Sequence, residues 1–181
     1  MKIVLLGYMG AGKTTVSRIL QQLLQGKGLR VKRHGIDEMV EKQAGCRITT
    51  LFLRGEESRF RNIETQCLQQ VMSTPKRAAI DMIDGGGGIV VSPKNRLLIA
   101  AADAVIWLDV PPDIAWQRVA STDERPLVQA GFAAFYRRYA AREPHYKALA
   151  TSKVDATAPP EVVAQWIVDQ CIEPYCTELL E

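Results

Sequence analysis

The chain has 181 residues, of which 47% are hydrophobic and 24% are charged, a composition typical of one globular domain with its own core. No apolar stretch approaches the roughly 20 residues that a membrane span requires. The formal net charge of +3 is too small to indicate nucleic-acid binding. We therefore expect a single domain over residues 1–181 that binds neither membranes nor nucleic acid. We also expect it to be a monomer.

Residues Met1-Lys2 lead directly into an apolar run, which leaves no room for a signal peptide and favours a cytoplasmic protein. The four cysteines lack metal-ligand spacing, so we expect free thiols without a chemical role. A local basic cluster is interpreted as a solvated connection, with a binding patch as the alternative; it comprises Lys27, Arg30, Lys32, Arg33 and His34.

The most informative segment is residues 7–14, Gly-Tyr-Met-Gly-Ala-Gly-Lys-Thr, between an apolar run and an amphipathic segment. This is the strand, glycine loop and helix pattern of a phosphate-binding loop. Glycines allow backbone N–H groups to surround an anion, and the following helix adds its positive N-terminal end. Lys13 can then reach the outer phosphates of a nucleoside triphosphate, and the Thr14 hydroxyl can bind Mg²⁺. An ordinary glycine-rich turn is the alternative.

Predicted strands and helices alternate along the rest of the chain. We expect strands over residues 3–6, 29–34, 78–83, 104–108 and 153–155. We expect helices after the phosphate loop to Gly26, from Asp37, over 56–72, from 93 to 102, from 112 to 120, over 132–149, and from Pro160. This alternation predicts an α/β fold in which helices cover both faces of a five-stranded parallel sheet. A polar, aperiodic stretch predicts a mobile lid over about residues 120–132.

Ligands of parallel sheets bind beyond the carboxyl ends of the strands, so residues that follow the predicted strands are candidates for chemistry. These are residues 7–14, Asp37, residues 84–88 and the segment after Leu108. Together with Arg61, Arg125 and Arg142, they indicate a kinase that acts on a small anionic alcohol.

At this point the sequence closely resembles the shikimate kinase family, part of the nucleoside monophosphate kinase-like P-loop group. The matching pieces are Gly-Tyr-Met-Gly-Ala-Gly-Lys-Thr-Thr at 7–15, Asp37 with Glu41 and Gly45, Phe60-Arg61 with Ile63-Glu64, Gly86-Gly87-Gly88, Arg125-Pro126-Leu127, and Arg142 with Pro144 and Tyr146. They keep the family order over nearly the whole chain. The resemblance implies a three-layer P-loop kinase fold that phosphorylates the 3-hydroxyl of shikimate with ATP and Mg²⁺, a step of aromatic amino acid biosynthesis.

The resemblance also implies roles for individual residues. The shikimate pocket, within a substrate segment of about residues 35–72 and its surroundings, would be formed by Asp37, Arg61, Gly86, Gly87, Gly88 and Arg142. The two arginines could fork onto a carboxylate while Asp37 orients a ring hydroxyl and accepts its proton. ATP would contact Gly10, Ala11, Gly12, Lys13, Thr14 and Thr15, with Arg118 and Pro159 or Pro160 beside adenine. Lys13, Mg²⁺ and the lid residue Arg125 would stabilise the transferring phosphoryl group.

The sequence departs from the family pattern at the end of the second strand. The family carries Asp-x-Asp there, and its first aspartate contacts the water shell of Mg²⁺, whereas this chain reads Gly35-Ile36-Asp37. Our hypothesis is that Asp84, ahead of the triple glycine, takes over this water-mediated contact. The connection before Asp37 is also several residues longer than in the family, which could reshape the edge of the substrate pocket.

Each candidate residue has a simpler structural explanation. Asp37 could be a helix N-cap, Arg61 could pair with Glu57 or Glu64 along its helix, and Arg142 could be a solvated helix residue. The glycine run could serve a turn alone, and Arg125 could be a plain loop residue. Three other functions remain open: a kinase of the same fold for another hydroxy acid, a nucleotide-binding regulatory module without turnover, and a nucleic-acid binder that uses residues 27–34.

Overall fold

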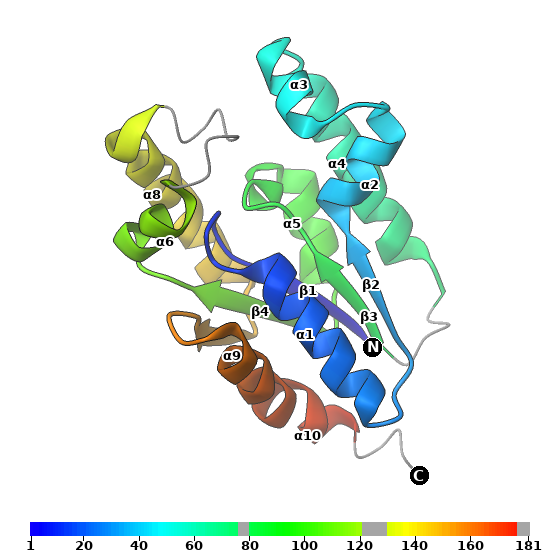
Figure 1. Cartoon of the computed structure of the whole chain (residues 1–181). Coiled ribbons are helices and arrows are strands. Elements are labelled where there is room, and N and C mark those ends of the chain that lie inside the picture. Colours follow the sequence, from blue (N-terminus) through cyan, green and yellow to red (C-terminus); the bar gives the residue numbers. More distant parts are fainter. Residues whose placement is uncertain (76–79, 121–129, 177–181) are drawn as a thin grey trace.

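The computed structural model describes residues 1–75, 80–120 and 130–176 (Figure 1). Arg125 and most of the expected lid lie outside these residues. None of the helices in the described part of the chain is long and apolar enough to cross a bilayer.

Within the described residues, a five-stranded sheet with the order β2-β3-β1-β4-β5 forms the centre of the molecule. Its strands are β1 (Lys2–Leu6), β2 (Val31–Gly35), β3 (Ile80–Asp84), β4 (Ala104–Asp109) and β5 (Ser152–Asp155). All neighbouring strands pair in parallel, so the predicted α/β fold is confirmed. The strands β1 and β3 are buried along their whole length because each has strands on both sides and helices above and below.

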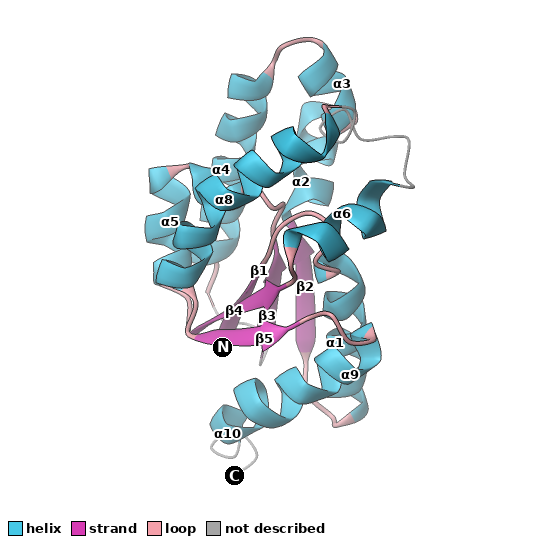
Figure 2. Ribbon diagram, turned by 90° about the vertical axis from the view of Figure 1, so that its left-hand side faces the viewer, coloured by secondary structure: helices cyan, strands magenta, loops and turns pink. Residues whose placement is uncertain are grey.

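Helices cover both faces of this sheet, as the two views together show (Figures 1 and 2). One face carries α1 (Lys13–Gly26) and α9 (Pro160–Ile167), and the chain continues from α9 through a π-helical turn (Val168–Ile172) into α10 (Glu173–Cys176). The other face carries α4 (Glu57–Ser73), α5 (Pro93–Ala100) and α8 (Gly131–Leu149). Near the carboxyl ends of the strands lie α2 (Ile36–Ala44), α3 (Ile48–Leu53) and α6 (Pro112–Ala120), and a 3₁₀ turn (Ile89–Val91) precedes α5.

One strand boundary was predicted wrongly, and one short helix was not predicted at all. The second strand begins at Val31 rather than residue 29, because Gly28 adopts a left-handed backbone (φ 83°) and the Leu29 N–H still caps α1 by donating to the Leu24 carbonyl. The short helix α3 was not predicted, since its sequence Ile-Thr-Thr-Leu-Phe-Leu is rich in residues of modest helix propensity. Burial of Leu51 and the contact between Phe52 and Phe60 of α4 stabilise it.

Two glycines of the phosphate loop offer a matched test of how this loop is seated. Both adopt left-handed backbones, with φ of 84° at Gly10 and 81° at Gly12. A Cβ at Gly10 would lie 2.4 Å from the Ala115 carbonyl oxygen of α6, whereas a Cβ at Gly12 would meet no atom within 4 Å. Alanine at either position would be strained by the left-handed backbone conformation. Only alanine at Gly10 would also collide with backbone atoms of α6.

We therefore expect Gly10→Ala to lower the free energy of unfolding by about 1–3 kcal/mol more than Gly12→Ala does. Urea unfolding of the nucleotide-free proteins measures this difference. Equal losses in the two variants would mean that the loop does not press against α6 as described.

Candidate active site

The phosphate loop joins β1 to α1, as the sequence predicted. The carbonyl of Tyr8 accepts hydrogen bonds from the Ala11 N–H (3.2 Å) and from Nζ of Lys13 (3.1 Å). Gly12 precedes the first residue of α1, and its carbonyl accepts the N–H of Val16 at 2.9 Å. The loop therefore closes around the N-terminus of a 14-residue helix, where backbone N–H groups and the helix dipole favour an anion.

A cavity of about 680 Å³ opens over this loop. It is lined by residues 9–16 of the loop and α1, by Asp37, by residues 84–87, by Arg118 and Val119 of α6, and by residues 156–160 with Val163. All the residues expected to contact ATP, including Thr14, Thr15 and Arg118, are among them, as are Pro159 and Pro160. We call this the larger cavity.

Arg118 ties two walls of the larger cavity together. Its guanidinium donates to the carbonyl of Gly10 (3.3 Å) in the phosphate loop and to the carbonyls of Ala156 and Thr157 (both 3.0 Å) after β5. Backbone carbonyls thus fix the plane of the guanidinium at the cavity wall, where a flat aromatic ring can stack on it.

A second cavity of about 340 Å³ adjoins the first and is called the smaller cavity. It is lined by Met9, by Asp37, Glu38 and Glu41 of α2, by Ile48, Thr49 and Phe52 of α3, by Phe60, Arg61 and Glu64 of α4, by residues 86–88, and by Arg142 of α8. All six residues expected to bind the acceptor meet here. The two cavities share four lining residues, namely Met9, Asp37, Gly86 and Gly87.

Asp37 lies at the junction of the two cavities. It is the second residue of α2, whose N-cap is Gly35, so the N-cap alternative is wrong. A Cβ at Gly86 would lie 2.7 Å from Oδ1 of Asp37, and a Cβ at Gly88 would lie 2.7 Å from Nη1 of Arg61. The glycine run therefore serves more than a turn, because it lets these two side chains approach the backbone closely.

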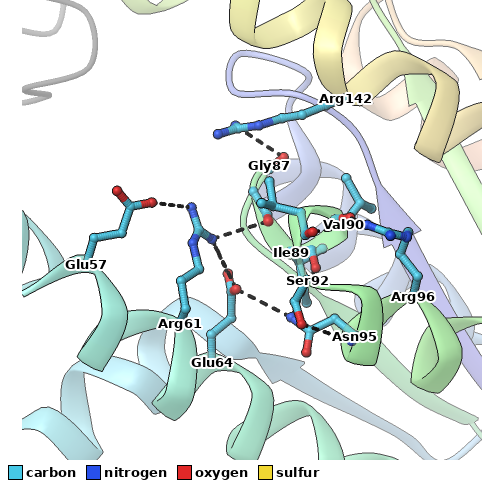
Figure 3. Close-up of polar contacts among 12 residues, drawn as sticks. Glu57, Arg61, Glu64, Gly87, Ile89, Val90, Ser92, Asn95, Arg96 and Arg142 are labelled. Atoms are coloured by element: carbon cyan, nitrogen blue, oxygen red, sulfur yellow. Dashed lines mark hydrogen bonds and ion pairs between the residues drawn. The ribbon is translucent and has the colours of Figure 1, made fainter.

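Arg61 of α4 lines the smaller cavity, and its guanidinium also forms a hydrogen bond and ion pairs with neighbouring residues of the protein (Figure 3). Its Nη1 donates to the Gly88 carbonyl at 3.2 Å and pairs with the Glu64 carboxylate at 3.1 Å, while Nη2 lies 3.3 Å from the Glu57 carboxylate. The predicted pairing along the helix is thus real. It holds the guanidinium at the cavity wall rather than in solvent, since the Arg61 side chain is only 20% exposed.

Glu64 was given no role in the site by the sequence analysis, where it appeared only in a family-matching piece and as a possible helix partner of Arg61. Its side chain is 0% exposed, and burial raises the pKa of its carboxyl to about 7, although the neighbouring Arg61 guanidinium opposes this shift. Asp37 raises this pKa slightly, and Arg142 lowers it. The signal in the sequence was an acidic residue within the apolar stripe of α4.

Arg142 enters from the opposite wall, on α8. Its Nη1 donates to the Gly87 carbonyl at 3.4 Å, and its Cζ lies 5.4 Å from the centre of the Tyr8 ring, a cation–π distance. Tyr146 donates its hydroxyl proton to the same Gly87 carbonyl. The alternative of a solvated helix residue is therefore wrong for Arg142. Tyr8 itself is 2% exposed and packs edge-on against Phe135 of α8.

Asp84 ends β3 and lines the larger cavity, where it is 5% exposed. Its Oδ2 accepts a hydrogen bond from the Ser17 hydroxyl (3.3 Å) and lies 3.5 Å from Nη1 of Arg33. Nη2 of Arg33 also donates to both carboxylate oxygens of Glu38, at 2.6 and 2.8 Å.

The basic cluster was predicted to be a solvated connection, and this prediction was wrong for two of its members. Arg33 and His34 are 13% and 10% exposed, and Nε2 of His34 lies 2.8 Å from the buried Asp81. A Cβ at Gly35 would lie 2.9 Å from Oε2 of Glu38 and 3.0 Å from Nη1 of Arg33. The ion pair thus occupies the space beside Gly35, and a side chain at this position would require the ends of Glu38 and Arg33 to move.

Comparison with known proteins identifies the family of the chain. A sequence model of the shikimate kinase family matches residues 9–173. The chain belongs to the shikimate kinase family. Shikimate kinase from Moorella thermoacetica is 38% identical over 148 residues, which are 80% of this chain and 79% of the relative. Shikimate kinase from Streptococcus gordonii is 34% identical over 171 residues, 92% and 98% of the two chains.

Solved structures agree with this assignment. Shikimate kinase from Acinetobacter baumannii in complex with shikimate matches with a TM-score of 0.82 and 29% identity, over 96% of this chain and 94% of that one. Deoxyadenosine kinase from M. mycoides with bound dATP matches at a TM-score of 0.60 and 15% identity, which shows a common fold alone. The protein is a small-molecule kinase with shikimate kinase activity and ATP as its co-substrate.

The buried Glu64 predicts a measurable dependence of stability on pH. Because its pKa is about 7 in the folded protein and 4.5 ordinarily, the folded state binds more protons than the unfolded state between these values, and stability falls as the pH rises through this window. Glu64→Gln cannot titrate. We expect the stability of this variant relative to the parent to rise by about 2–3 kcal/mol from pH 5 to pH 8, measured by urea unfolding. Parallel pH profiles would contradict the raised pKa.

Proposed function

We propose that shikimate occupies the smaller cavity and ATP the larger one, and that the phosphoryl group passes between them beside Asp37. The observation that carries this proposal is the set of lining residues common to both cavities, Met9, Asp37, Gly86 and Gly87. Two ligands that share a wall of this kind can bring an acceptor hydroxyl up to a terminal phosphate, and phosphoryl transfer depends mostly on such positioning.

Shikimate is an anion with several ring hydroxyls, and the smaller cavity has complementary groups. Arg61 and Arg142 lie on separate elements, and both donate to carbonyls of the run Gly86–Gly88, so their guanidinium groups converge on one region. They bind the carboxylate. Asp37 accepts a hydrogen bond from the reacting hydroxyl, orients it, and takes up its proton during transfer.

ATP is held by the phosphate loop and the walls of the larger cavity. Backbone N–H groups of Gly10 and Gly12 surround the phosphates, with Ala11 beside them and the hydroxyls of Thr14 and Thr15. Lys13 leaves the Tyr8 carbonyl for the outer phosphates when nucleotide binds. Arg118 stacks on adenine. Arg125, which lies outside the described residues, is the lid arginine that approaches the γ-phosphoryl group.

Mg²⁺ fits the donors at this site. Within residues 1–75, 80–120 and 130–176, no group of three or more His, Cys, Asp or Glu side chains is arranged to hold a metal ion. Mg²⁺ that is bound mainly by phosphates and water needs only one or two protein oxygens, which here are the Thr14 hydroxyl directly and the Asp84 carboxylate through water. When bound, the ion neutralises charge that develops on the phosphates.

The substrate assignment is tested by a matched pair of arginines on α4. Arg61→Ala removes a guanidinium at the smaller cavity, whereas Arg59→Ala removes one that pairs with Glu56 at 2.7 Å and is 51% exposed. In an ADP-release assay with shikimate, we expect Arg61→Ala to raise the KM for shikimate on the order of 100-fold, because a charge-assisted contact worth about 3 kcal/mol is lost. The KM for ATP should change little.

Arg59→Ala should keep both KM values. An Arg61→Ala enzyme with the parent KM for shikimate would refute the proposed pocket, and equal effects in both variants would indicate a general change in α4.

The magnesium assignment is tested at β3. We expect Asp84→Asn to raise the Mg²⁺ concentration for half-maximal activity several-fold, because a neutral amide attracts the hydrated cation less than a carboxylate does. The same shift should appear in the Mg²⁺ dependence of ATP binding by calorimetry. Asp81→Asn serves as the control, since Asp81 lies on the same strand but pairs with His34. An unchanged magnesium dependence in Asp84→Asn would discard the assignment.

A further inference from the structure

A buried amide lies behind the carboxylate that holds Arg61 (Figure 3). Asn95 belongs to the first turn of α5, is 0% exposed, and is not among the residues that line the smaller cavity. Its Nδ2 donates to the Ile89 carbonyl at 3.0 Å and to Oε2 of Glu64 at 3.4 Å. Asn95 therefore connects the 3₁₀ turn that follows the glycine run to the carboxylate on α4.

These contacts close a ring of hydrogen bonds. Nη1 of Arg61 donates to the Gly88 carbonyl (3.2 Å) and to the Glu64 carboxylate (3.1 Å), and the Asn95 amide joins that carboxylate to the carbonyl of the next residue, Ile89. The guanidinium is thus held to the backbone at positions 88 and 89 both directly and through two buried side chains.

The orientation of the Asn95 amide follows from its surroundings. The backbone carbonyl of Ile89 can only accept a hydrogen bond, so the NH₂ group must face it, and the same group then lies beside Oε2 of Glu64. Oδ1 is left buried without a hydrogen-bond partner among the described residues. A buried acceptor without a partner is unfavourable, and the protein retains it here while both donor contacts are made.

Arg61 has two carboxylate partners, one buried and one exposed to solvent. Glu64 is 0% exposed, whereas Glu57 is 59% exposed and lies 3.3 Å from Nη2. The Glu64 carboxylate adds to the direct contact with the Gly88 carbonyl in keeping the guanidinium at the cavity, and it does so best when its own rotation is restricted. The Asn95 amide restricts it, so loss of this amide would favour rotation of Glu64 and an outward position of Arg61.

We propose that Asn95 is a positioning residue for shikimate, acting through Glu64 to hold the Arg61 guanidinium in its binding orientation. This inference rests on the proposed function, in which Arg61 binds the substrate carboxylate. Asn95 does not touch the substrate. Its effect is on the fraction of molecules in which the Arg61 guanidinium is oriented to bind the shikimate carboxylate.

The same helix provides a matched control. The Ser92 hydroxyl caps α5 by accepting the Asn95 N–H at 3.4 Å. Ser92→Ala weakens the start of the helix without removing either contact of the Asn95 amide. A purely structural role of α5 would therefore affect the Ser92 and Asn95 variants alike.

The test is steady-state kinetics of the full chain with ATP and shikimate. We expect Asn95→Ala and Asn95→Leu to raise the KM for shikimate by about tenfold, with kcat and the KM for ATP within about twofold of the parent. Asn95→Leu keeps the side-chain volume, so it reports the lost donors if the alanine variant does not fold. Ser92→Ala should keep the parent KM for shikimate. An unchanged KM in the Asn95 variants, or an equal rise in Ser92→Ala, would overturn the proposal.

A double variant separates this inference from the proposed function. If Asn95 acts through Arg61, Asn95→Ala should have no further effect on the KM for shikimate in the Arg61→Ala background. Independent, multiplying effects would overturn the inference alone. If Arg61→Ala itself leaves this KM unchanged, the proposed pocket fails, and the inference fails with it.

Discussion

The close approach of the backbone at Gly86–Gly88 to three neighbouring elements is the constraint on which the site depends. A Cβ at Gly86 would collide with Asp37 of α2, one at Gly87 would lie 3.0 Å from the N–H nitrogen of Met9 in the phosphate loop, and one at Gly88 would collide with Arg61 of α4. Absence of side chains along this run lets the nucleotide loop and the acceptor pocket share a single wall. Carbonyls of the same run accept hydrogen bonds from Arg61, Arg142 and Tyr146.

Two buried carboxylates beside this wall each have a partner of opposite charge among the described residues. Glu64 is fully buried but pairs with Arg61, and Asp84 lies against Ser17 and Arg33. Burying a carboxylate is costly unless a cation or hydrogen-bond donor compensates it. Compensation is incomplete at Glu64, as its raised pKa indicates.

Local patterns in the sequence were sufficient where one segment carries the whole motif. Residues 7–14 contain the glycines, the lysine and the threonine of the phosphate loop, and strands and helices alternate regularly enough to predict the sheet. Local sequence patterns were insufficient to predict the surroundings of Arg33 and Asn95. Arg33 was read as solvated because its partners Glu38 and Asp84 come from other elements, and Asn95 gave no signal because an asparagine in the first turn of a helix is commonplace.

The sequence by itself determined the P-loop kinase fold, the reaction class and most residues that line the two cavities, because family motifs and strand ends are local properties. Only the tertiary structure decided which of those side chains converge, that Asp37 lies at the junction rather than at an N-cap, and that an ion pair fills the space beside Gly35. Such facts depend on distances between segments far apart in the chain. Packing sets those distances, and no single segment encodes them.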